Sequence, residues 1–192
     1  MRINSLLFLT GNEGKAQELN ELLALPDLKI SHQKLNLTEN QSAKIQEVSL
    51  FKTRLALAHP DLEQGWDAVL TDDVGLSLDA LNGLPGPLIK FFLDSLGPKG
   101  VYDLTGNKGT GATAECMLGL GLPRSGEILH FQGLVKGELV EPMGEDGFGW
   151  DPIFKPQGQS QTYAQMGLAE KNRISHRALA IAKLKEWILS SP

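Results

Sequence analysis

Short continuous runs of apolar residues alternate along the chain with segments in which apolar residues recur at helical spacing. Residues 6–9 form a run typical of a buried strand, and residues 16–23 then carry a helical pattern. Residues 29–33 alternate weakly and predict a short strand. A second helix is predicted over residues 44–58, where Pro60 follows. The first third of the chain therefore has an α/β pattern.

The next buried run is followed directly by two acidic residues. Residues 68–71 predict a strand that delivers Asp72 and Asp73 at its C-terminal end, where ligands gather in open α/β sheets. A turn-rich loop over residues 81–87 then leads into a helix predicted over residues 88–96, which a Gly-Pro pair stops. A polar site is expected at this strand end.

The second half of the chain has the pattern of a β-rich segment closed by a helix. Strands are predicted over residues 111–120, 127–134 and 138–141, with Gly-rich connections and without clear crossover helices. An amphipathic helix is predicted over residues 175–189. We therefore expect a mixed sheet, and the lack of any linker predicts a single domain over residues 1–192.

Composition and charge restrict the classes of function. The chain has 192 residues, and 18 Lys and Arg against 23 Asp and Glu give a net charge of −5, which argues against a nucleic-acid partner. The single cysteine, Cys116, excludes an internal disulfide and a cysteine-based zinc site, and fits a cytoplasmic protein. No stretch has the length of a membrane span, and the first apolar run is too short for a signal peptide.

An aromatic residue between two glycines precedes a cluster of hydrogen-bond donors near the C-terminus. The glycines on both sides of Phe148 leave a ring face free, and a flat purine that carries a carbonyl oxygen suits both the ring and the donors. The donors are Lys171, Ser175, His176 and Arg177. Ser175 lacks the Gly-x-Ser-x-Gly surroundings of a nucleophile, so a binding role is favoured. The alternative is an N-capping serine beside basic residues on a solvated helix face.

A second polar site is predicted where the first strand turns into the first helix. Thr10, Gly11, Asn12 and Lys15 combine backbone N–H groups, a hydroxyl, an amide and a cation at the positive end of a helix. These are the parts of a polyphosphate site, although the spacing differs from that of a Walker P-loop. A plain loop with a helix N-cap is the alternative.

The adjacent carboxylates of Asp72 and Asp73 indicate a cation site. Magnesium prefers oxygen ligands and often joins one or two carboxylates to substrate phosphates. Because neighbouring strand residues point to opposite faces, one carboxylate is expected at the metal, and we choose Asp73. Glu39 is the preferred second carboxylate and Glu47 the reserve. Asp73 as a simple turn-capping acid is the alternative.

Five blocks, in this order and spread over nearly the whole chain, carry a resemblance to a known family. They are Thr10-Gly11-Asn12 with Lys15, Asp72-Asp73 with Gly75-Leu76, Leu81-Asn82-Gly83-Leu84-Pro85-Gly86-Pro87, Gly147-Phe148-Gly149-Trp150-Asp151-Pro152-Ile153-Phe154, and Glu170-Lys171-Asn172 with Ser175-His176-Arg177. Together these blocks resemble the inosine triphosphate pyrophosphatase family, also called Ham1-like. The resemblance implies an elongated mixed sheet with flanking helices and two lobes around an active-site cleft.

The resemblance also implies an activity. Members hydrolyse ITP, dITP and XTP to the monophosphate and pyrophosphate, use Mg²⁺, act as homodimers and remove altered purines from the nucleotide pool. By motif, the phosphate contacts would be Thr10, Gly11, Asn12, Lys15, Lys52 and Lys90, the metal ligands Glu39 and Asp73, and the residues for the rest of the nucleotide Phe148, Gly149, Trp150, Asp151, Lys171, Ser175, His176 and Arg177. Asp73, Lys15 and Lys52 would be catalytic.

Some residues depart from the family pattern, and two other functions stay open. Gln165 stands where a Glu is usual, Ala178 replaces a frequent Gly, and Glu115 in an apolar strand has no explanation from the sequence. One alternative is a house-cleaning pyrophosphatase for other altered nucleotides, as in the related Maf-like proteins. The other is a nucleotide-binding module without turnover.

Overall fold

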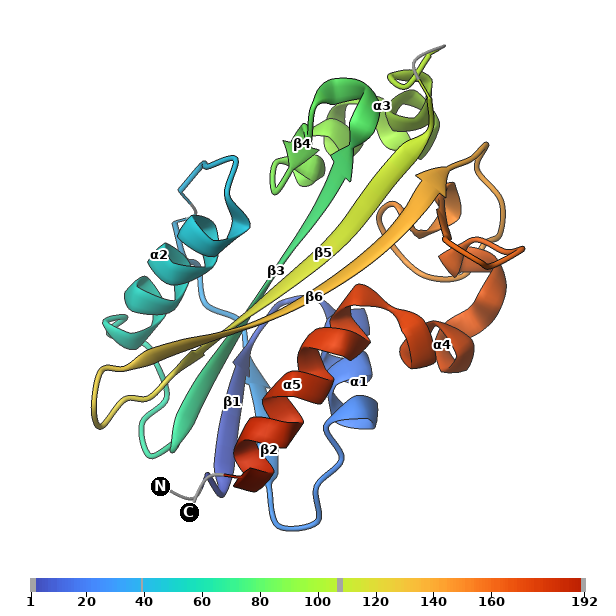
Figure 1. Ribbon diagram of the computed structural model, residues 1–192. Coiled ribbons are helices and arrows are strands. Elements are labelled where there is room, and N and C mark those ends of the chain that lie inside the picture. Colours follow the sequence, from blue (N-terminus) through green and yellow to red (C-terminus); the bar gives the residue numbers. More distant parts are fainter. Residues whose placement is uncertain (1–2, 39, 107–108, 191–192) are drawn as a thin grey trace.

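The computed structural model describes residues 3–38, 40–106 and 109–190 (Figure 1). Within these residues the strands are β1 (Ser5–Leu9), β2 (Lys29–Gln33), β3 (Ala68–Leu78), β4 (Pro85–Gly86), β5 (Gly111–Gly121), β6 (Ile128–Leu139) and β7 (Phe154–Pro156). The helices are α1 (Glu13–Leu22), α2 (Ile45–Leu57), α3 (Ile89–Asp103), α4 (Tyr163–Ile174) and α5 (His176–Ser190), with short 3-10 turns at Asp79–Leu81 and Asp151–Ile153.

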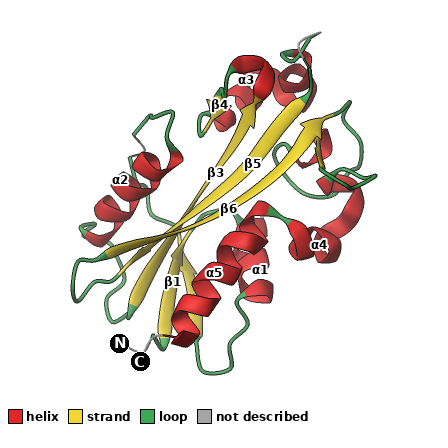
Figure 2. Cartoon of the chain, in the orientation of Figure 1, coloured by secondary structure: helices red, strands yellow, loops and turns green. Residues whose placement is uncertain are grey.

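The strands form one mixed sheet, as the sequence predicts. Their order is β2-β1-β3-β5-β6-β7, and β4 pairs with the far part of β3. The pairs of β1 with β2 and β3 are parallel, whereas all pairs that involve β4 to β7 are antiparallel. The long strands β3, β5 and β6 cross the molecule as a twisted ribbon (Figure 1). Helix α2 lies on one side of this ribbon, and α1 and α5 lie on the other (Figure 2).

Two predicted strand boundaries are wrong, and both errors concern long antiparallel strands. Asp72 and Asp73 lie in the middle of β3 and not at its end, because β3 keeps pairing with β5 as far as Leu78. The parallel partner β1 pairs with β3 only as far as Leu70. The two carboxylates therefore lie just beyond the point where β1 ends. Similarly, the two strands predicted over residues 127–134 and 138–141 are the single strand β6.

The helix signals predict most helices but miss α4. The predicted stop after residue 96 is confirmed as a break, because Gly97 has a non-helical φ of 67° and a second helical segment follows it. Helix α4 begins with a capping box in which the Thr162 side chain accepts from the Gln165 N–H and the Gln165 side chain accepts from the Thr162 N–H. The neutral Gln165 thus supplies the same acceptor as the Glu that is usual at this position.

The core fills both sides of the ribbon along its whole length. One cluster packs α1 and α5 against β1, β3 and β5, and includes the fully buried Leu6, Leu70 and Leu184. A second cluster lies at the other end of the ribbon, around Leu76 and Trp150. Each fully buried side chain of this size contributes about 1.5 to 3 kcal/mol. The same sheet runs through both clusters, and the division of one domain into two lobes stays a prediction.

Two further features of the fold bear on the sequence analysis. Glu115 accepts a hydrogen bond from the exposed Gln132 side chain on the neighbouring strand at 2.5 Å, which gives this acid a partner. In the described part of the chain, none of the helices has the length and apolar character needed to span a membrane.

Candidate active site

A cleft of about 750 Å³ opens where the loops after β1 and β2, the middle of β3, the start of α3 and the loop before residue 151 meet. It brings together most of the residues predicted for the site, namely Thr10, Gly11, Asn12, Lys15, Lys52, Lys90, Phe148, Gly149, Trp150, Asp151, Lys171, His176 and Arg177. Asp72 also lines the cleft. Asp73 and Ser175 do not line it, and Glu39 lies outside the described residues.

The first turn of α1 forms one wall of the cleft. Asn12 caps this helix by accepting a hydrogen bond from the Lys15 N–H at 3.1 Å, and the Thr10 hydroxyl accepts from the Asn12 N–H at 3.0 Å. The cap directs the Lys15 side chain back across the end of β1 to the carboxylate of Asp72. The N-cap is confirmed, whereas the polyphosphate site predicted at the same turn stays a prediction.

The neighbouring carboxylates of β3 point to opposite faces of the sheet. Asp72 points toward α1 and α5, where its Oδ1 pairs with Lys15 and its Oδ2 accepts from Arg177 Nε at 2.7 Å. Asp73 points toward α2, where its Oδ1 lies 2.8 Å from Lys52 Nζ. This alternation follows from the pleat of a strand. The two acids therefore have separate cationic partners.

The two carboxylates also differ in acidity. Burial opposes the ionisation of Asp72, but the charges of Arg177 and Lys15 outweigh it and hold the pKa of Asp72 well below its usual range. Burial raises the pKa of Asp73, and Lys52 offsets that rise only in part. Asp73 Oδ2 is buried and has no hydrogen-bond partner among the described residues. Asp72 is thus a fixed anion, whereas Asp73 keeps one buried carboxylate oxygen that lacks a partner among the described residues.

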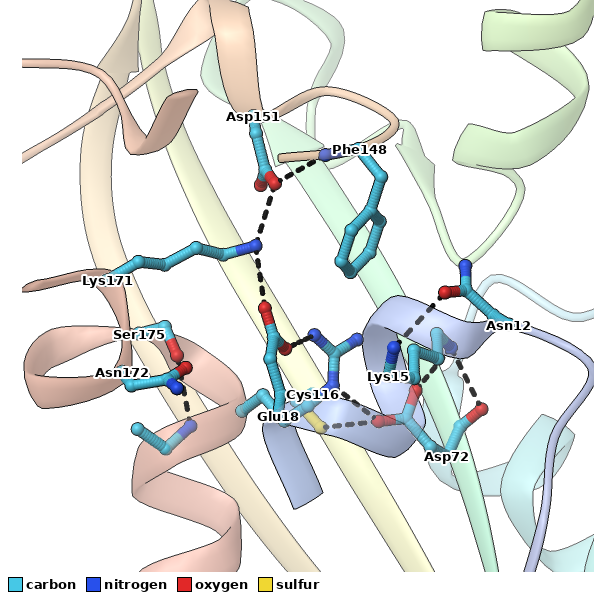
Figure 3. A network of polar contacts seen from close by, with 12 residues as sticks. Asn12, Lys15, Glu18, Asp72, Cys116, Phe148, Asp151, Lys171, Asn172 and Ser175 are labelled. Carbon is cyan, nitrogen blue, oxygen red and sulfur yellow. Dashed lines mark hydrogen bonds and ion pairs between the residues drawn. The ribbon is translucent and has the colours of Figure 1, made fainter. Parts of the chain in front are cut away.

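Glu18 is a residue of the site that the sequence analysis missed. Its carboxylate is fully buried between two cations that the analysis singled out, with Oε1 3.0 Å from Lys171 Nζ and Oε2 paired with Arg177 (Figure 3). The signal in the sequence is an acid on the apolar face of α1, directly before the buried Leu19. A charge in such a position needs partners, and here it fixes both cations.

A second acid, Asp151, ties Lys171 to the aromatic loop. Its Oδ2 lies 2.7 Å from Lys171 Nζ and accepts a hydrogen bond from the Phe148 N–H at 2.9 Å (Figure 3). Burial raises the pKa of Asp151, and Lys171 counteracts the rise. Gly147 is required beside this carboxylate, because its φ is 85° and a Cβ atom there would lie 2.4 Å from Asp151 Oδ2.

The Phe148 ring lies between the start of α1 and the buried cations. Lys171 Nζ is 4.4 Å from the ring centroid and the Arg177 guanidinium carbon is 5.6 Å from it. A Cβ atom on Gly14 would come within 3.0 Å of the ring, so the ring rests against the α1 backbone. The predicted aromatic platform and the predicted donors are therefore neighbours in space, although they lie over 20 residues apart in the sequence.

His176 and Ser175 have different environments at the start of α5. The His176 ring is buried 5.1 Å from the Trp150 ring and 6.0 Å from the Tyr163 ring, measured between centroids. Burial, and then the nearby Arg177 charge, lower the pKa of His176 well below its usual value, so the imidazole is neutral. Ser175 Oγ accepts from the Ala178 N–H at 3.1 Å, which favours the N-cap interpretation over substrate binding.

The lowered pKa of His176 predicts a pH-dependent stability. Below pH 6.5, its ordinary value, the unfolded chain binds a proton at this side chain that the folded chain does not bind. The free energy of unfolding should therefore fall as the pH drops below 6.5, by up to about 1.4 kcal/mol per pH unit from this group. Urea unfolding between pH 7.5 and 5.5 measures the slope. His176→Gln should flatten it, and an equal slope in both proteins would contradict the assignment.

Two predicted ligands lie apart from the inner cluster. Lys90 is exposed at the rim and pairs with Asp94 at 2.7 Å. Glu47, the reserve metal ligand, is exposed and binds Ser42 and Lys44 instead of facing the cleft. Among the residues that the structure describes, no group of three or more His, Cys, Asp or Glu is arranged to hold a metal ion.

Known proteins resemble this chain over nearly its whole length. Residues 6–187 match the model of the Ham1 family. A Neurospora crassa protein named inosine triphosphate pyrophosphatase is 45% identical over 181 residues, 94% of this chain and 90% of that protein. A Methanopyrus kandleri protein named dITP/XTP pyrophosphatase is 35% identical over 184 residues, 95% of each. A solved HAM1 protein from Coxiella burnetii covers 100% of both chains with a TM-score of 0.74 at 27% identity.

Proposed function

Because this chain belongs to the Ham1 family, we propose that it is a nucleoside triphosphate pyrophosphatase that converts ITP, dITP and XTP to their monophosphates and pyrophosphate. The observation that carries the proposal is that the aromatic platform of Phe148 and the lysines beside Asp72 and Asp73 line one cleft. Such a cleft suits a guest with a flat ring at one end and a polyphosphate at the other.

The base end of the cleft supports a purine with a keto oxygen at position six. Arg177 Nη2 is buried and has no hydrogen-bond partner among the described residues, so it is a donor in need of an acceptor. Lys171, beside the Phe148 ring, adds a second cation whose charge Glu18 and Asp151 hold in place. The amino group of adenine would leave such donors unpaired, at a cost of about 1 to 3 kcal/mol each.

The phosphate end is formed by Lys15, Lys52 and the N-terminus of α1. Both lysines line the cleft while they pair with Asp72 and Asp73. A phosphate in the cleft can therefore bind their ammonium groups after a rotation of the side chains alone, with the backbone unchanged. When Lys52 turns to a phosphate, the Asp73 carboxylate loses this ion pair and becomes available. The wall of α1 adds the favourable end of a helix dipole.

The residues present fit a magnesium ion that is held largely by the substrate. Asp73 Oδ2 is buried and lacks a hydrogen-bond partner in the described part of the chain, as expected of an oxygen that serves a cation or its water. Mg²⁺ keeps several waters and needs only one or two carboxylates besides substrate phosphates. When bound, the ion would neutralise phosphate charge. Glu39 as the second ligand stays a prediction.

The proposed reaction is a direct attack of water on the α-phosphorus. Asp73, with a raised pKa, orients the water and accepts its proton as the oxygen–phosphorus bond forms. Lys15 and Lys52 stabilise the negative charge that develops on the departing pyrophosphate. No covalent enzyme intermediate is needed, because the water itself attacks the α-phosphorus.

A product analysis tests the function. The purified protein is incubated with Mg²⁺ and ITP, XTP, GTP, ATP or dUTP, and monophosphate, diphosphate, pyrophosphate and inorganic phosphate are quantified. Pyrophosphate and monophosphate from ITP and XTP, with little from ATP, are expected. Inorganic phosphate with a diphosphate would exclude attack at the α-phosphorus. Turnover of dUTP alone would favour the Maf-like function, and nucleotide binding without any product would favour a module without turnover.

A homodimer and a cytoplasmic location also belong to this proposal. Both rest on the resemblance of the sequence blocks to the family. Sedimentation equilibrium of the purified chain tests the first, and a mass near 20.9 kDa would contradict it. Localisation of a tagged chain in its native cell tests the second.

A further inference from the structure

Most charges of the cleft cancel among the described residues. Five of the six cations that line it are Lys15, Lys52, Lys90, Lys171 and Arg177. Each of them pairs with at least one of five carboxylates, Glu18, Asp72, Asp73, Asp94 and Asp151. Five positive charges thus meet five negative charges. These groups alone give no net attraction for a polyphosphate, which carries several negative charges at neutral pH.

One more cation lines the same cleft and was not singled out by the sequence motifs. Lys34 follows the last residue of β2 and is exposed at the mouth of the cleft. It forms no ion pair with any carboxylate in the part of the chain that the structure describes, and so contributes the unbalanced positive charge of the cleft.

The Lys34 side chain is held in place by Gly11. A Cβ atom on Gly11 would lie 3.0 Å from Lys34 Cδ and 3.3 Å from Lys34 Cε, so the aliphatic stem rests directly on the bare backbone of the turn before α1. The ammonium is one bond beyond Cε and therefore stays close to that turn. A surface lysine without such a contact would spread its charge over many rotamers.

The position of Lys34 determines which part of the nucleotide this side chain can contact. The segment from Gly11 to Lys15 touches the Phe148 ring at Gly14 and the Lys34 stem at Gly11, so ring and ammonium lie at different ends of this segment. With the base at Phe148, the distal phosphates face Lys34. We infer that Lys34 binds the β- and γ-phosphates of the triphosphate and the pyrophosphate that they become, an assignment that rests on the proposed function.

The inference defines what the loss of the charge should do. Lys34→Met keeps the stem over Gly11 and removes only the ammonium. We expect about 10-fold weaker binding of pyrophosphate and about 10-fold higher KM for ITP, because one charge-assisted contact is lost. The binding of IMP should not change. Lys34→Arg should restore most of both. A solvated lysine with no role would leave every value at the wild-type level.

The test uses pyrophosphate itself as the probe, by isothermal titration calorimetry with Mg²⁺, besides ITP kinetics. Lys136→Met is the matched control, because Lys136 is an exposed lysine of β6 that lies outside the cleft. The inference is overturned if Lys34→Met binds pyrophosphate like the wild type, if both variants lose affinity equally, or if the wild type binds none.

The Lys34 assignment and the proposed function can be contradicted separately. If the wild type releases pyrophosphate from ITP but Lys34→Met has unchanged pyrophosphate affinity and KM, only the Lys34 assignment is wrong. If pyrophosphate binding depends on Lys34 but ITP yields no pyrophosphate, the proposed function fails and the anion site stands. Circular dichroism and urea unfolding of Lys34→Met should match the wild type, since the side chain is exposed.

Discussion

Replacing Asp73 by Asn is expected to lower the rate of pyrophosphate release from ITP by about 1000-fold, because it removes the carboxylate proposed as general base and metal ligand. The amide keeps the size of the side chain but binds neither a proton nor a cation well. Because burial raises the pKa of Asp73, the folded protein already carries this group at a cost, and its neutral replacement should not lower the free energy of unfolding. Steady-state kinetics and urea unfolding measure both quantities.

Asp103→Asn provides the control for that experiment. Asp103 is an exposed acid of α3 that pairs with Lys99, outside the cleft, and its loss should leave turnover within about twofold of the wild type. Normal ITP hydrolysis by Asp73→Asn would show that this carboxylate is neither the base nor a metal ligand. A collapse of the fold in Asp73→Asn would show instead that its ion pair with Lys52 is structural.

The second large effect is expected at Glu18. Its side chain is 1% exposed and faces the ammonium of Lys171 and the guanidinium of Arg177, so Glu18→Gln leaves two buried cations short of one negative charge. Removing one partner of a buried ion pair costs about 3 to 5 kcal/mol of the free energy of unfolding. Urea unfolding at pH 7.5 measures this loss, and the midpoint should fall without a large change in slope.

Glu170→Gln is the matched control for Glu18→Gln. Glu170 forms an exposed pair with Arg173 on α4, and such pairs contribute about 0 to 1 kcal/mol. Equal unfolding energies for the two variants would mean that the buried network contributes no more than a surface pair. The role of Glu18 in holding the base-side donors would then have no energetic support.

The apolar periodicity predicts most of the fold, and its errors have a common cause. The strand over residues 29–33 and the terminal helix are confirmed almost to the residue. The lengths of β3 and β6 are wrong because polar and small residues are tolerated inside a long strand that stays paired: Asp72 pairs with β5, and Gly137 pairs with both β5 and β7. Helix α4 was missed because its kink at Gly167 interrupts the helical period.

Sequence motifs identify the residues of the site better than they identify which of these side chains pair with each other. The blocks around Asn12, Asp72 and Phe148 converge on one cleft, as the resemblance implies. Pairing is different, because it depends on contacts between distant segments: Glu18 and Arg177 are 159 residues apart. Lys34 belongs to no motif and is found only through its contact with Gly11. The catalytic and binding roles themselves stay predictions.

Asp72 is shared between the two ends of the cleft, since one of its oxygens pairs with Lys15 and the other with Arg177. In the proposed function, a guest whose phosphates bind Lys15 would leave this anion to Arg177 alone, and the charge around the guanidinium would change. Recognition of the base and binding of the phosphates would then be coupled through a single carboxylate, so a nucleoside without phosphates should meet Arg177 in a different electrostatic environment than a complete nucleotide does.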